Sequence, residues 1–249
     1  MLCPRLHPAI LLTAALAALA ATPLRAEQAA VQNDRIVFDI SIKGLSAARL
    51  TIGGSVNAST YVAKGTLKSA GLLAFVKKVR YDAETSGHFA AGRFTPARYS
   101  EKADTGKRQS EAVMAYVGGV PQVKSYNPPK KARAQALDPA TQGGTVDPLT
   151  ALFAILRAVP RDAACDQVLT LFDGRRRSQV TLGPAKTAGD AISCDGEYRR
   201  LEGFSAKDMA EKARFPFQLT YGPAAGEAMV QVTEISMDTL YGNGRMIRQ

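Results

Sequence analysis

The segment Cys165-Asp-Gln-Val-Leu-Thr-Leu-Phe-Asp-Gly-Arg-Arg-Arg177, continued by Ser178-Gln-Val-Thr-Leu182, carries the pattern that decides the fold. Two short apolar runs flank Asp173-Gly174, a dipeptide that favours a tight turn between antiparallel strands. A connection rich in Gly and Pro then leads to Cys194. We therefore predict a β-hairpin that a disulfide between Cys165 and Cys194 fastens to the next strand.

The cysteine count depends on how the N-terminus is interpreted. Arg5 precedes an apolar run, 9–21, that is too short to cross a bilayer as a helix of the mature protein. A small residue, Ala26, follows, so residues 1–26 are typical of an export signal cleaved near Ala26. The alternative is a retained membrane anchor. Cys3 lies ahead of the apolar run, so we expect no lipid anchor.

Export has consequences for location and for the remaining cysteines. We expect a periplasmic protein with no retained transmembrane segment. Only Cys165 and Cys194 remain after cleavage, and two cysteines in an oxidising compartment most simply form one disulfide. Such a bond contributes about 3–4 kcal/mol in the chain-entropy model. The alternative is two unpaired buried thiols.

Alternating apolar and polar side chains dominate residues 34–241, as in 36–42 and in the hairpin around Gly118-Gly119. About ten to twelve such runs predict an all-β fold, mainly antiparallel, with a curved or barrel-like sheet. Pro96 and a change of phase near Glu234 indicate bulges. We expect one domain over 34–241 and a tail at 242–249.

Helix signals are few. Asp147 as N-cap and Pro148 at the first helical position, followed by apolar residues at helical spacing, predict a helix over about 147–159 that packs on the sheet. Ser205–Asp208 resembles a capping box and predicts a short helix. The apolar segment 69–76, followed by basic residues, is either a short helix closing one end of the barrel or a loop that contacts a membrane.

The segment 127–146 is expected to be a long exposed loop. It contains Pro128-Pro129 and the basic residues Lys130, Lys131 and Arg133. A run of this kind is either a solvated loop or a grip for an anionic surface.

Few groups remain for catalysis. His88 is the one histidine of the mature chain, and we expect it in a turn after Gly87. The sequence has no nucleophile elbow, no phosphate-binding glycine loop and no set of residues for a zinc site. We therefore predict no catalytic residue, no cofactor and no metal. Signatures of nucleic-acid binding are missing too.

Two kinds of charged group leave a choice open. Asp195 and Glu197, and likewise Asp82 and Glu84, share a strand face, which is either a solvated face or the acid pair of a hydrolase. The three arginines Arg175, Arg176 and Arg177 follow the Asp173-Gly174 turn. They either keep a strand edge soluble or, together with Lys130 and Lys131, bind phosphate or carboxylate.

The export signal, the Asp147-Pro148-Leu149 helix start and the turn 172–176 between two cysteines together resemble a bacterial exported family. That family is known as domain of unknown function 3108 (DUF3108). The resemblance covers about 34–241. It implies an exported, β-rich protein with no assigned activity and transfers no catalytic residue. The β-rich character is also similar to that of envelope lipoprotein carriers, whose open barrels shelter acyl chains.

We therefore expect a non-catalytic periplasmic protein that binds a hydrophobic or anionic envelope component in the concave face of its sheet. The net charge of +10 favours anionic partners at long range. One alternative is a scaffold that binds a protein or the cell wall through its outer surface. The other is a hydrolase that uses carboxylates alone.

Overall fold

A computed structural model describes residues 31–71, 74, 78–129, 135–189, 191–225 and 228–249. The export signal predicted at 1–26 lies outside the described residues. So do Lys130 and Lys131 and much of the segment 69–76.

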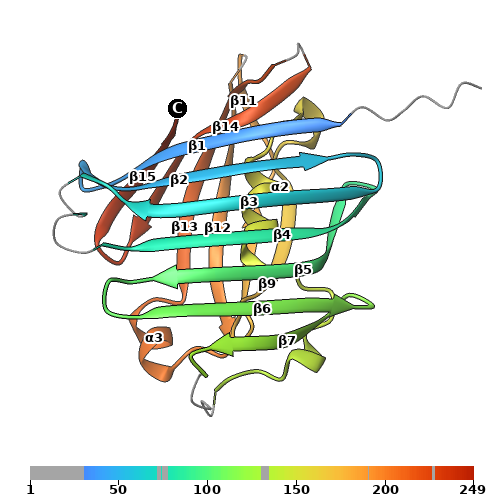
Figure 1. Ribbon diagram of the computed structural model, residues 1–249. Coiled ribbons are helices and arrows are strands. Elements are labelled where there is room, and N and C mark those ends of the chain that lie inside the picture. Colours follow the sequence, from blue (N-terminus) through green and yellow to red (C-terminus); the bar gives the residue numbers. More distant parts are fainter. Residues whose placement is uncertain (1–30, 72–73, 75–77, 130–134, 190, 226–227) are drawn as a thin grey trace, which may run out of the picture.

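The described chain forms one antiparallel sheet of fifteen strands, which confirms the predicted all-β class. In spatial order the main path runs β7-β6-β5-β4-β3-β2-β1-β15-β14-β13-β12-β10-β9, and it does not close on itself (Figure 1). The strands are β1 (Gln32–Ile42), β2 (Leu45–Val56), β3 (Thr60–Ser69), β4 (Arg80–Ala90), β5 (Arg93–Asp104), β6 (Gln109–Val117), β7 (Val120–Asn127), β8 (Val159–Pro160), β9 (Gln167–Phe172), β10 (Arg177–Leu182), β11 (Lys186–Ala188), β12 (Ala191–Glu202), β13 (Arg214–Pro223), β14 (Met229–Thr239) and β15 (Gly242–Arg248).

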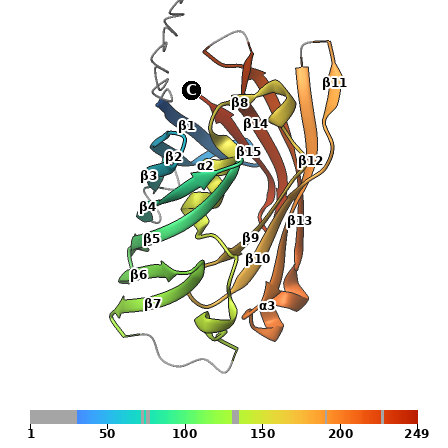
Figure 2. The same cartoon turned by 90° about the vertical axis from the view of Figure 1, so that its right-hand side faces the viewer.

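The long sheet curves so that strands β2–β7 form one layer and strands β12–β14 form a second layer that faces it (Figure 2). Because successive side chains of a strand point to opposite faces, every second residue of β1 points inward, and Ile36 and Phe38 are fully buried. Bulges lie where the sequence indicated them, beside Pro96 in β5 and between Val232 and Glu234 in β14. Each inserts an extra residue and bends its strand, which helps the sheet to curve.

The segment 242–249 is not a tail, contrary to the expectation from sequence. Residues 242–248 form β15, which pairs with β1 on one side and β14 on the other. Arg248 also donates hydrogen bonds to the backbone oxygens of Val232 and Leu156. Gly242 and Gly244 have no side chains, so the alternation of apolar and polar residues is weak in this part of the sequence. The strand nevertheless joins the N-terminal and C-terminal parts of the sheet.

Helix α2 (Pro148–Leu156) lies between the two layers of the sheet (Figure 2). Asp147 caps it as predicted, but the helix ends at Leu156 because Arg157 adopts an extended backbone. Seven of its nine residues are buried. Two glycines of the sheet allow the helix to pack close to the strands. A Cβ on Gly54 would lie 2.6 Å from Phe153, and one on Gly65 would lie 2.8 Å from Leu149.

The connection from β7 to α2 is less exposed than the sequence suggested. After the short 3₁₀ helix η1 (Pro139–Thr141), the side chains of Gln142, Thr145 and Val146 are buried. The backbone of Val146 exchanges hydrogen bonds with Thr170 and Phe172 of the edge strand β9, each of 2.9 Å. The prediction of an exposed loop over 127–146 is therefore wrong for its last residues, because they cover part of the gap between the sheet's two ends.

The decisive hairpin is present as β9 and β10, and the disulfide Cys165–Cys194 joins its start to β12. Both cysteines are buried. Helix α3 (Ala206–Glu211) begins with the predicted capping box of Ser205 and Asp208, and a second 3₁₀ helix, η2, spans Arg161–Ala163. No helix in the described part of the chain has the length and apolarity needed to cross a membrane.

Candidate functional site

The concave face of the sheet is occupied by α2 and by a small polar cluster. Asp147 is 0% exposed, and its carboxylate accepts hydrogen bonds from the Thr150 backbone N–H (2.9 Å), the Thr150 hydroxyl (2.6 Å) and the Thr85 hydroxyl (2.9 Å). The Tyr61 hydroxyl lies 2.7 Å from that of Thr150. Burial raises the pKa of Asp147 to about 6, because a carboxylate away from water is costly to charge.

This arrangement changes where a ligand can bind. The concave face was expected to bind a ligand, but its inward side chains, such as Ile52 and Leu50, belong to one apolar core that includes Leu149, Phe153 and Leu156 of α2. A curved sheet that is filled by its own helix has its candidate binding surfaces on the outside and at the gap between its ends.

The Asp173-Gly174 turn organises one end of the molecule. The Asp173 carboxylate accepts the backbone N–H groups of Arg175 and Arg176, each at 2.9 Å. Gly174 has φ +87°, and a side chain there would collide with the Tyr126 hydroxyl. The Arg175 guanidinium lies 5.8 Å from the ring centre of Tyr126, so the turn also packs against the end of β7.

Arg176 takes part in a second group of aromatic contacts. Its guanidinium lies 5.3 Å from the ring centre of Phe204. The Arg200 guanidinium lies 5.4 Å from the ring centre of the same Phe204 and 5.1 Å from that of Phe215. Arg200 also donates a hydrogen bond of 2.9 Å to the Lys212 backbone oxygen. Arg176 and Arg200 thus hold the turn against the start of α3 through cation–π contacts.

Four arginines surround one depression of about 460 Å³ beside α3, which we call the arginine depression. It is lined by Arg177 of β10, Arg199 and Arg200 of β12 and Arg214 of β13, with Glu202 as its one acidic lining residue among those described. Arg199 stands directly opposite Arg214 in the ladder. Two like charges in that position destabilise a sheet, so stability alone does not explain them.

The partners of these arginines differ. Arg214 forms an ion pair of 2.6 Å with Glu197. Within the described residues the structure gives Arg177 and Arg199 no ion pair, and Arg199 is exposed. Arg177 and Arg199 therefore have donors available for an anion.

Sequence reasoning identified part of this site. Of the three consecutive arginines, Arg177 lines the depression, whereas Arg175 and Arg176 stack on aromatic rings. It missed Arg199, Arg200 and Arg214, because only the strand register brings β12 and β13 beside Arg177. The basic pair at 199–200 was the one available signal.

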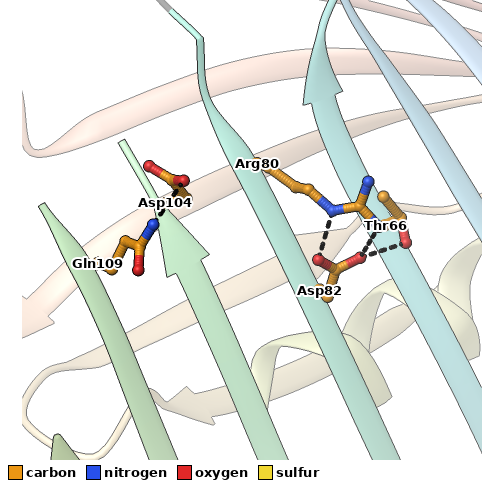
Figure 3. Close-up of polar contacts among 5 residues, drawn as sticks. All are labelled: Thr66, Arg80, Asp82, Asp104 and Gln109. Atoms are coloured by element: carbon orange, nitrogen blue, oxygen red, sulfur yellow. Dashed lines mark hydrogen bonds and ion pairs between the residues drawn. The ribbon is translucent and has the colours of Figure 1, made fainter. Parts of the chain in front are cut away.

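The paired acids are held by basic partners on the outer face of the sheet. Asp82 accepts hydrogen bonds from Arg80 (2.6 Å) and Thr66 (2.8 Å), as Figure 3 shows. The same figure shows the hydrogen bond that Gln109 of β6 donates to Asp104 of β5. The hydrogen bond from Arg80 lowers the pKa of Asp82. Glu84 pairs with Lys64 at 2.9 Å. The lowered pKa of Asp82 does not suit a proton donor.

The second acid pair behaves similarly. Asp195 forms an ion pair with Lys186, whose hydrogen bond lowers the pKa of Asp195, and Glu197 holds Arg214. His88 was expected in a turn but lies in β4, opposite Thr60 of β3 and Thr95 of β5, and it is exposed. Gly87 allows close strand contact there rather than a turn, because a Cβ on it would collide with the backbone of Thr95. Over the described ranges, no three His, Cys, Asp or Glu residues gather as a metal site.

Because the ion pair of Arg80 with Asp82 is exposed, Arg80→Ala is expected to change the free energy of unfolding by less than about 1 kcal/mol. Chemical denaturation at low and high salt measures this change. A loss of several kcal/mol would mean that the outer ion pairs hold the sheet together.

The fold and these sites define a β-rich protein with an antiparallel, barrel-like sheet around helix α2, in which the acids of β4 and β12 pair with basic side chains. The chain belongs to the family of proteins of unknown function DUF3108, whose model matches residues 37–201. It is similar to the solved "Beta-barrel-like Protein of Domain of Unknown Function DUF1849" from Brucella abortus, with a TM-score of 0.47 and 16% identity, over 87% of this chain and 95% of that chain. No curated protein matches the chain.

Proposed function

We propose that this is a non-catalytic periplasmic protein that binds an anionic component of the cell envelope through the arginine depression. The observation that carries the proposal is the like-charged pair Arg199 and Arg214 beside Arg177, around one hollow of about 460 Å³. Guanidinium groups bind phosphate and carboxylate with two parallel hydrogen bonds, so a bound anion would relieve the repulsion between them.

The place of binding differs from the sequence expectation. A ligand in the concave face would have to displace α2, whose Phe153 is 0% exposed. The outer face needs no such rearrangement, and the net charge of +10 draws anions toward it. A phosphate of a lipid head group and a phosphate free in solution share the chemistry that this site would recognise.

A hydrolase based on the paired acids is not proposed. General acid catalysis needs a carboxyl group with a raised pKa, whereas ion pairs lower the pKa of Asp82 and Asp195.

The test is binding of the mature chain to vesicles of phosphatidylglycerol, with phosphatidylcholine vesicles and inorganic phosphate as parallel probes. The double variant Arg177→Gln, Arg199→Gln is expected to bind phosphatidylglycerol vesicles at least about tenfold more weakly, because it removes two charge-assisted donors. Binding to phosphate but not to vesicles would assign the site to a free anion.

The matched control is Arg35→Gln, Arg98→Gln, which removes the same charge from exposed arginines of β1 and β5. It is expected to weaken binding only slightly, as a long-range effect that salt screens. Equal losses in both double variants, or no binding of any anionic probe by the wild type, would refute the proposal.

A further inference from the structure

A second cleft lies at the gap in the sheet, and its lining residues differ from those of the arginine depression. It has a volume of about 400 Å³. One wall is the start of β5, with Arg93 and Phe94, and the other is the edge strand β9 from Gln167 to Thr170. Ala154 and Arg157 at the end of α2 also line it. The cleft is therefore framed by a strand edge, an aromatic ring and two arginines.

Strand β9 has an uncovered edge in this cleft. Its other edge pairs with β10, and Val146 occupies its free edge only at Thr170 and Phe172. Because backbone groups alternate in direction along a strand, the N–H and C=O of Val168 point to the same side as those of Thr170 and Phe172. The side chain of Val168 is 61% exposed, a large fraction for a valine. An exposed strand edge of this kind is a template for another strand.

Arg157 is a charged group with unused hydrogen-bonding capacity. Its guanidinium lies 5.4 Å from the ring centre of Phe89 and 5.5 Å from that of Phe94, and it donates one hydrogen bond, of 3.0 Å, to the Ala158 oxygen. Its Nε is buried and has no partner within the described residues. Burial lowers the pKa of Arg157.

The carboxylate of Asp34 acts on Arg157 but does not satisfy it. Asp34 favours the charged form of Arg157, but the Asp34 carboxylate accepts hydrogen bonds from the Ala158 N–H (2.8 Å) and from the Gln32 side chain (2.7 Å). A partly buried guanidinium without a carboxylate partner is costly unless an anion completes it. Arg93, exposed at the same cleft, adds a second positive charge.

We propose that this cleft binds an extended peptide segment of a partner protein, which adds as a strand to the free edge of β9 and places a carboxylate against Arg157 and Arg93. The strand edge supplies backbone hydrogen bonds, and the arginines select a segment with an acidic side chain or a free C-terminus. The uncovered edge is short, so three to four residues of the partner, roughly 10–14 Å of extended chain, fit it. This inference is independent of the arginine depression.

The experiment uses the mature chain and arrays of short immobilised peptides in three matched sets. One set has free C-terminal carboxylates, one is amidated and contains Glu, and one is amidated and neutral. We expect binding from the carboxylate-bearing sets and none from the neutral set. For the best-binding peptide in solution, Arg157→Gln is expected to weaken binding at least tenfold, whereas Arg35→Gln leaves it unchanged.

A second variant tests the strand edge without depending on the charge. Val168→Pro removes an N–H that points away from β10, so the hairpin ladder is retained while the added strand loses a donor. We expect weaker peptide binding with an unchanged thermal midpoint, and slower amide exchange at Val168 and Thr170 when the peptide is bound to the wild type. Binding of acetate without amide protection, equal binding of the neutral set, pairing of two copies of the chain through β9, or no binding at all would each overturn the proposal.

Discussion

Phe153→Ala is expected to lower the free energy of unfolding by about 3–5 kcal/mol, the range for removing a fully buried aromatic ring. Phe153 is 0% exposed at the centre of α2, and its ring fits against Gly54, where even a Cβ would lie only 2.6 Å away. The neighbouring strand cannot collapse into the space, because it is held in a long sheet. Urea unfolding followed by circular dichroism measures the loss.

The matched control is Leu152→Ala on the same helix. Leu152 is 40% exposed and faces away from the core, so its removal is expected to cost less than about 1 kcal/mol. If Phe153→Ala were as mild as Leu152→Ala, α2 would not fill the sheet, and the concave face would again be available to a ligand.

The second large effect is expected at Asp147. Asp147→Ala removes the cap of α2, leaves the Thr150 N–H without its acceptor, and breaks the hydrogen bonds that the hydroxyls of Thr85 and Thr150 donate to the carboxylate. The expected loss is about 2–4 kcal/mol, as a lost cap together with buried unsatisfied groups. Asp147→Asn keeps an acceptor for the Thr150 N–H and carries no charge, so it is expected to be much milder.

Comparing the wild type with Asp147→Asn also gives a pH test. Folding raises the pKa of Asp147 from an ordinary 3.8 to about 6, so the folded state binds the proton more tightly than the unfolded state. The contribution of this group to stability is therefore greatest below about pH 4 and is lost as the pH rises through 6, by up to about 3 kcal/mol.

Denaturant titrations between pH 4 and 8 measure this dependence. The wild type is expected to lose stability relative to Asp147→Asn across that interval, since the variant has no carboxyl group to ionise. Parallel curves for the two proteins would show that the carboxylate is not desolvated as its burial indicates.

Much of the fold could be predicted from local signals. Period-two alternation identified strands such as β1, and the caps at Asp147 and Ser205 identified α2 and α3. These features depend on neighbouring residues, as does the turn at Asp173-Gly174. The disulfide was predictable because only two cysteines lie outside the predicted export signal.

Other features depend on contacts between distant parts of the chain. Strand β15 has a weak pattern of its own and forms because β1 and β14 both offer it a partner. Val146 is buried because it completes part of the gap beside β9. The arginine depression appears only when the register sets Arg199 beside Arg214, so the sequence pointed to three consecutive arginines, of which one lines the site.

The proposed place of binding, outside the sheet rather than within it, can be tested directly by nuclear magnetic resonance. The chain without residues 1–26 is titrated with a short-chain phosphatidylglycerol while backbone amides and core methyl groups are followed. Binding at the arginine depression predicts shifts at the amides of Arg177, Arg199 and Arg214, with the methyl groups of Leu149, Ile52 and Leu156 unchanged. Shifts at those methyl groups, without shifts at the arginines, would place the ligand in the interior and contradict the account.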